Sequence, residues 1–198
     1  TYIVGSIGFT PARGNNGSFT YGSWADKFPF NEIKPCVFKN GVVQYYLNPN
    51  DYTKKQDGSN ADVTSGNDGD VMIEFPKVYW SIESVGNYIN VRYSDVKADD
   101  SFVCLAHNNG YTEKDKIYIS AYGGYELGGK LRSLSGKTPT SSKTISDFRN
   151  IAQANGSSYN QMTYYSLLML QVLYVVMFKS LNSQTALGYG RTNASSTN

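Results

Sequence analysis

Histidine and cysteine, the residues on which most metal centres and many nucleophilic enzymes depend, are almost absent from this sequence. One histidine, His107, and two cysteines, Cys36 and Cys104, occur among 198 residues. Metal sites built from several histidines are therefore excluded, and the cysteines lack the C-x-x-C spacing of zinc and redox sites. We expect no cofactor, no metal, no catalytic residue and no enzymatic activity, with His107 as a loop or structural residue.

The two cysteines leave two alternatives open. They could form one disulfide across a long loop, or remain free thiols that pack as small hydrophobic side chains. No secretory targeting segment is visible at Thr1. We therefore expect two free, partly buried thiols.

Charge and long apolar runs are also scarce. Charged residues make up 17% of the chain and the formal net charge is +2, which provides no electrostatic footprint for nucleic acid or an anionic membrane. The longest apolar run, 164–178, covers 15 residues and is interrupted by Gln171, whereas a membrane span needs about 20. We expect neither nucleic-acid binding nor membrane insertion.

Tyrosine, glycine, serine and asparagine take the place of charge. The chain contains 17 tyrosines and 19 glycines, and aromatic residues make up 14%, too many for a disordered chain. Tyrosine supplies wide contact area at low entropic cost, while Ser, Asn and Gly supply adaptable hydrogen bonds. This composition is typical of adhesive surfaces and predicts a folded binding module.

Short apolar runs bounded by Gly, Asn, Asp and Ser predict strands in most of the chain. The clearest begins after the turn at 67–70, where Val71, Ile73 and Phe75 alternate on one face until Pro76 ends the strand. Further runs occupy residues 2–4, 42–47, 78–82, 88–93 and 116–122. Residues 51–70 are interpreted as the longest loop.

Two helices are predicted in the last third, at about 144–155 and 163–180. Thr144 can cap the first with Asp147 three residues later, and Ile145, Phe148, Ile151 and Ala152 would share its buried face up to Gly156. The second is apolar on all sides, which predicts a buried, central helix. The pattern of short antiparallel strands, long loops and two helices predicts an α+β fold in one domain, 1–198.

Acidic residues in two arrangements could be taken for functional sites. Asp57, Asp62, Asp68 and Asp70 could hold calcium through oxygen ligands, but the EF-hand spacing is absent and turns use the same residues. Asp70 and Glu74 are four residues apart on the same face of one strand and could be mistaken for a catalytic acid/base pair. Without a partner that shifts their pKa values, we expect them to be structural.

An ordered set of motifs covers most of the chain from about Gly41. It comprises GDVMIEFPKVYW at 69–80, IYISAY at 117–122, LRSLSG at 131–136, the helix with Phe148 and Arg149, and LNSQ at 181–184. In this order the motifs resemble the C-type-lectin-fold receptor-binding proteins of bacteriophage tails, including diversity-generating retroelement variable proteins and phage tropism determinants. The resemblance implies a C-type-lectin-like domain, related in fold to formylglycine-generating enzymes, on a virion tail or extracellular surface.

Two departures from that family matter. Its chains usually continue past the LNSQ segment into Trp-rich strands, whereas this sequence stops at Asn198, so the native protein is longer or the fold is closed by another segment or chain. The enzyme branch needs a pair of cysteines near the C-terminus, which Cys36 and Cys104 do not match. The resemblance thus implies host-cell attachment rather than catalysis.

Three functional hypotheses follow. The first is a host-binding tail or adhesin domain that attaches to a cell-surface protein or glycan; the alternatives are a structural virion or surface-assembly protein of the same fold, and an oxidase or hydrolase. Other tail proteins are implied partners, and the resemblance suggests a homotrimer.

We expect ligand contacts in the loops at 122–126 and 188–193, which combine aromatic anchors, glycines and a charged group. The candidate ligand-binding residues are Tyr122, Tyr125, Tyr189 and Arg191. The alternative for Tyr122 is the end of a buried strand, and for Tyr189 packing beneath a turn.

Overall fold

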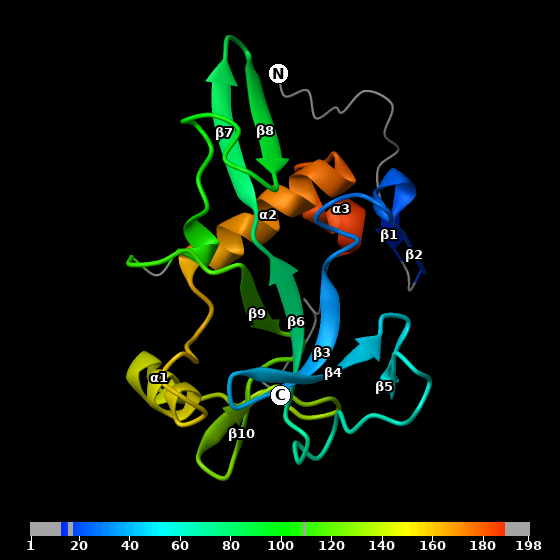
Figure 1. The fold of residues 1–198 in the computed structure, drawn as a ribbon, viewed down its shortest axis with the longest axis vertical. Helices are drawn as coiled ribbons and strands as arrows, with labels where there is room; N and C mark the ends of the chain where they lie inside the picture. The colour runs from blue at the N-terminus through cyan, green and yellow to red at the C-terminus, as the bar shows by residue number, and fades with distance from the viewer. Residues whose placement is uncertain (1–12, 16–17, 109, 189–198) are drawn as a thin grey trace. The chain divides into compact units, whose positions relative to one another are not determined.

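The computed structural model describes residues 13–15, 18–108 and 110–188, which divide into two compact units. Unit 1 comprises the described residues up to Glu32, Pro76–Asp115 and those from Tyr164 onward, and unit 2 comprises Ile33–Phe75 and Lys116–Thr163. The chain thus passes repeatedly from one unit to the other, and the expected single domain over 1–198 stays a prediction. Antiparallel strands together with three helices in the described residues confirm the predicted α+β class (Figure 1).

Unit 2 is built on a five-stranded sheet. Its strands lie in the order β5 (Asp51–Lys55), β4 (Val42–Asn48), β3 (Lys34–Lys39), β6 (Asp70–Pro76) and β9 (Lys116–Ser120). β3 pairs antiparallel with both β4 and β6. The core of this unit is a cluster of four buried residues, Val37, Leu47, Val63 and Val71. We call it the valine cluster.

Strand β6 lies between two neighbours and is buried on both faces. Val71 and Phe75 are buried as the alternation predicts, but Asp70 and Glu74 on the opposite face are buried as well. The turn before it needs a glycine at position 69. The φ of Gly69 is +142°, and a Cβ atom on this residue would lie only 2.5 Å from the Phe38 carbonyl oxygen. β3 can therefore come this close to the turn only because Gly69 has no side chain.

The expected loop at 51–70 is wrong at its start, where β5 pairs with β4 through Leu47 and Lys55. The sequence of β5 has one aromatic residue and no run of apolar ones, so no alternation marks it. The conformation at the start of β5 is fixed by Asp51, whose carboxylate accepts hydrogen bonds from both the backbone N–H and the hydroxyl of Thr53. Pairing with a neighbouring strand overrides the polar composition here.

A hairpin and a helix complete unit 2. Strands β10 (Tyr125–Leu127) and β11 (Lys130–Arg132) pair antiparallel across Gly128 and Gly129, whose φ values of +59° and +74° suit a two-residue hairpin turn. Helix α1 (Ile145–Gln153) has Thr144 as its N-cap and shows the predicted capping box. The side chains of Thr144 and Asp147 each accept a hydrogen bond from the backbone N–H of the other residue. Ala152 is buried, whereas Ile145, expected on the same face, is exposed in the first turn. α1 lies against β11.

Unit 1 combines two hairpins, two short 3-10 turns and two helices. The elements are β1 (Arg13–Asn15), β2 (Ser18–Thr20), η1 (Gly22–Trp24), β7 (Tyr79–Val85), β8 (Tyr88–Ser94), η2 (Leu105–His107), α2 (Tyr164–Phe178) and α3 (Ser183–Leu187). β1 pairs with β2 and β7 with β8, both antiparallel. Trp24, Met177 and Phe178 form the buried cluster of this unit, with Phe30 and Tyr93 packed against it.

Helix α2 confirms the predicted apolar helix but not its complete burial. Its second half carries most of the buried residues, among them Leu173 and Met177, whereas Tyr164 and Leu167 in its first half are 70% and 43% exposed. Leu170 in the middle is half-buried. Among the described elements α2 packs mainly against β8 and η2, and Tyr164, Leu167 and Gln171, three or four positions apart on one side of its first half, are exposed. No helix within the described ranges is long and apolar enough to cross a membrane.

Candidate ligand pocket

The four predicted ligand-binding residues lie in two segments, of which the structure describes one. Tyr189 and Arg191 fall outside the described residues. Tyr122 is half-buried against the valine cluster, and its backbone N–H donates to Ser133 Oγ at 3.1 Å. Tyr125 is half-buried on β10, with its ring centroid 5.9 Å from Lys137 Nζ. The ligand roles of all four stay predictions.

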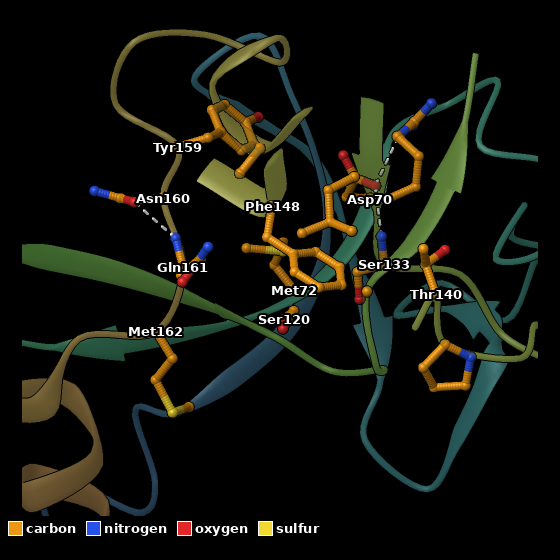
Figure 2. A pocket seen from close by; sticks show the side chains of 15 residues that line it. Asp70, Met72, Ser120, Ser133, Thr140, Phe148, Tyr159, Asn160, Gln161 and Met162 are labelled. Carbon is orange, nitrogen blue, oxygen red and sulfur yellow. Dashed lines mark hydrogen bonds and ion pairs between the residues drawn. The ribbon is translucent and has the colours of Figure 1, made fainter. Parts of the chain in front are cut away.

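A pocket of about 300 Å³ lies beside this loop in unit 2, between the sheet and α1 (Figure 2). Strands contribute Asp70 and Met72 of β6, Ser120 of β9, and Leu131 and Arg132 of β11, and helix α1 contributes Phe148 and Ala152. The rest of the lining comes from segments between these elements, namely Gly124, Ser133 and residues 139–140 and 159–162. Gly124 is the point at which the predicted loop at 122–126 borders the pocket. No local motif could predict this site, because its walls come from six separate stretches of sequence.

Asp70 forms the polar wall. Its side chain is buried, at 6% exposure, and its Oδ1 accepts hydrogen bonds of 2.8 Å from both Arg132 Nε and the backbone N–H of Ser133. Arg132 also donates from Nη2 to the Gly66 carbonyl oxygen at 2.9 Å. These additional hydrogen bonds offset the desolvation of a buried ion pair. In Figure 2 the other carboxylate oxygen of Asp70 points toward the side where Tyr159 lies.

The hydroxyl groups in the wall are largely occupied by the backbone. Ser133 Oγ donates to the Val71 carbonyl oxygen at 2.6 Å and accepts from the Tyr122 N–H. Thr140 Oγ1 accepts from the Glu126 N–H at 2.8 Å, which leaves its proton available to donate. Ser120 and Asn160 also line the pocket but are exposed, so few buried polar groups of the pocket are available to a ligand.

Phe148 and Met72, which Figure 2 shows next to each other, form the apolar wall together with Leu131. Phe148 projects from α1, whose end is tied to β11 by a 2.8 Å hydrogen bond from Asn155 Nδ2 to the Leu131 carbonyl oxygen. The segment that closes the opposite side is tied to the start of α1 through Gln161 Nε2 and the Ile145 carbonyl oxygen, at 2.7 Å. These bonds tie the segments that line the pocket to one another.

Glu74 lies on the same strand as Asp70 but has its own partners. It is 3% exposed and accepts hydrogen bonds from Lys116 Nζ at 2.7 Å, Tyr118 Oη at 2.9 Å and Tyr46 Oη at 3.2 Å. Asp70 and Glu74 are therefore two separately satisfied carboxylates, each with its own cation, and their structural role stays a prediction. Burial is the main cause of the raised pKa of Tyr46 and Tyr118, with Glu74 adding to it.

In the loop that follows β5, the carboxylates of Asp57, Asp62 and Asp68 accept hydrogen bonds from backbone and hydroxyl groups. Asp57 accepts hydrogen bonds from the N–H and hydroxyl of Ser59, and hydrogen bonding to Ser59 lowers its pKa. Asp62 accepts from the backbone of residues 64 and 65, and Asp68 from Tyr45 Oη at 2.7 Å. Among the described residues no group of three or more His, Cys, Asp or Glu side chains could hold a metal ion.

The thiols and the histidine are buried. Cys36 and Cys104 are free, which confirms the expected free thiols, and burial raises their pKa to about 12 and about 11. Both thiols are therefore protonated at neutral pH, and protonated thiols are poor nucleophiles. His107 is buried at the end of η2, where its carbonyl oxygen accepts from the Lys114 N–H at 2.9 Å.

The described residues thus define a sheet-rich α+β protein with a small pocket that is mostly apolar and contains one internal ion pair. In comparisons with known proteins, no family model matches the sequence, and neither a curated protein nor a solved structure matches the chain. The resemblance to C-type-lectin-fold phage proteins stays a prediction that rests on the ordered motifs.

Proposed function

We propose that this chain is a non-enzymatic, C-type-lectin-like binding domain of a phage tail or surface adhesin that attaches to a receptor on a host cell, a protein or a glycan. The observation that carries the proposal is the pocket in unit 2. It combines an apolar wall with the buried carboxylate of Asp70, whose charge is neutralised by Arg132. Such pockets hold ligands by shape and a few placed hydrogen bonds.

The state of the reactive groups supports binding rather than catalysis. Nucleophilic and acid/base catalysis require an activated side chain. The raised pKa of each thiol keeps Cys36 and Cys104 protonated, and the two buried carboxylates are held by Arg132 and Lys116. The Tyr, Ser, Asn and Gly composition also supports an adhesive role.

Staining of bacterial cells tests this function. We expect the fluorescently labelled chain to stain cells of some strains in a broad panel, and an excess of unlabelled chain to displace it. The chain after irreversible heat unfolding is the control, because it carries the same label without the pocket. If the folded chain stains no strain above this control, the attachment function is wrong.

A second candidate, a structural protein of virion or surface assembly, is favoured by the exposed side of α2. Tyr164 and Leu167 are exposed on this side and Tyr165 next to it, and the two tyrosine rings contact each other edge to face, with centroids 5.9 Å apart. Neighbouring exposed apolar side chains often mark contacts with other proteins. Light scattering of the double variant Tyr164→Lys, Leu167→Lys checks this candidate, which predicts that the variant loses assembly while an attachment domain keeps cell staining.

A further inference from the structure

We propose that the pocket in unit 2 accepts a phenol group, the side chain of a tyrosine on a protein receptor. This inference rests on the proposed attachment function and narrows its receptor from a protein or glycan to a protein. The ring would lie against Phe148 and Leu131, and its hydroxyl would donate to the carboxylate oxygen of Asp70 that Arg132 does not occupy (Figure 2).

The charge of the pocket selects a neutral ligand. Because Arg132 pairs with the Asp70 carboxylate, the pair carries no net charge that would hold either an anion or a cation. The carboxylate oxygen of Asp70 that Arg132 does not occupy can accept a hydrogen bond from a ligand. A hydrogen bond to a charged acceptor is about twice as strong as one between neutral groups. An O–H donor of a neutral group therefore fits.

The number of free polar groups distinguishes a phenol from a sugar. The Ser133 hydroxyl already donates to Val71 and accepts from Tyr122, and the Thr140 hydroxyl accepts from Glu126 and keeps one proton to donate. Ser120 and Asn160, which also line the pocket, are exposed. A sugar ring would place several hydroxyls against Phe148, Met72 and Leu131, and each buried hydroxyl without a partner costs about 1–3 kcal/mol. A phenol has one hydroxyl and an apolar ring.

The size and lining of the pocket agree with an aromatic ring. Its volume of about 300 Å³ is at the lower end of the roughly 300–1,000 Å³ of small-molecule sites, enough for one side chain but not for an extended chain. Phe148 offers an edge-to-face contact and Met72 a thioether, both of which favour aromatic partners. Tyrosine is also among the residues that most often anchor protein interfaces.

The test uses small probes with the intact chain. N-acetyl-tyrosine amide is titrated while the methyl resonances of methionines labelled with ¹³C are followed by NMR, with N-acetyl-phenylalanine amide as the probe that lacks only the hydroxyl. We expect saturable millimolar binding of the tyrosine amide and affinity about tenfold lower for the phenylalanine amide, as expected for one hydrogen bond to a charged group. Methyl glucoside should not bind.

Two variants place the probe in the pocket. Ser120→Phe fills the pocket from its exposed edge at the end of β9, and we expect it to abolish binding of the tyrosine amide. The matched control is Ser84→Phe, the same change at an exposed position of β7 in unit 1, which should leave binding unchanged. If Ser120→Phe fails to fold, saturating tyrosine amide must still displace the wild-type chain from cells.

The outcomes separate this inference from the attachment function. Equal binding of both amides, or binding of methyl glucoside in place of the tyrosine amide, overturns the phenol site while cell staining can persist. Binding of the tyrosine amide that Ser120→Phe does not affect also overturns it, since the probe then binds elsewhere. Probe binding that behaves as expected, together with a chain that stains no cells, supports the phenol site and contradicts the attachment function.

Discussion

At the scale of residues, the buried charges of unit 2 are satisfied in ways that the sequence could only partly predict. A structural role for Asp70 and Glu74 followed from the lack of any evident partner, yet both have one: Arg132 for Asp70 and Lys116 for Glu74. These partners are 62 and 42 residues away along the chain, so no local spacing could identify them. The satisfied carboxylates stabilise the pocket wall and the sheet.

The cluster around Glu74 predicts a loss of stability in alkali. The pKa of Tyr118 is raised above its ordinary value of 10.0, mainly by burial, and that of Lys116 is raised mainly by its hydrogen bond to Glu74. The folded chain therefore holds protons that the unfolded chain releases above about pH 10, and its free energy of unfolding should fall as pH rises.

Urea unfolding between pH 9 and 11.5 measures this slope. Tyr118→Phe removes one of the titrating groups and should flatten the slope by up to about 1.4 kcal/mol per pH unit, the value for a single proton. Tyr111→Phe is the matched control, because it is the same change at a residue of unit 1 that is 95% exposed. An unchanged slope in Tyr118→Phe would contradict the assignment.

At the scale of elements, the sequence predicted those whose signals are local. The capping box at Thr144 and Asp147 located α1, and alternation located β6, because both signals depend on neighbours a few residues apart. β5 and the exposed side of α2 were missed. The pairing of β5 with β4 and the limited cover of α2 are tertiary facts, and the hydrophobicity of a helix does not say which of its sides another element covers.

The one-sided burial of α2 predicts an asymmetric response to charge. Leu173→Asp should abolish cooperative folding, since Leu173 is 5% exposed and its replacement would bury an unpaired carboxylate. Leu167→Asp, six residues earlier on the exposed side, should change the free energy of unfolding by less than about 1 kcal/mol. Circular dichroism during thermal unfolding compares the two. A Leu173→Asp protein that melts like the wild type would show that α2 is not part of the core.

At the scale of the whole molecule, the candidate site joins segments that the sequence keeps apart. Asp70, Arg132 and Phe148 meet in one pocket although they lie on a strand, a hairpin and a helix. The predicted loop at 122–126 reached this site only at Gly124, because aromatic and glycine content can indicate a surface loop but not the wall it borders. Contacts between distant segments are decided by the sheet order, which the sequence pattern alone did not provide.

Metal removal gives a prediction for the molecule as a whole. We expect EDTA to leave the melting temperature unchanged, because the carboxylates of Asp57, Asp62 and Asp68 are used by nearby backbone and hydroxyl donors and Asp70 by Arg132. A calcium ion held at 100 times its Kd would contribute about 2.7 kcal/mol, roughly 5–10 °C in melting temperature for a chain of this size. Calorimetry with EDTA and then with excess calcium resolves such a shift. A drop in EDTA that calcium restores would show that the acidic loop rearranges into a metal site, and the turn hydrogen bonds of Asp57 and Asp62 would then belong only to the metal-free state.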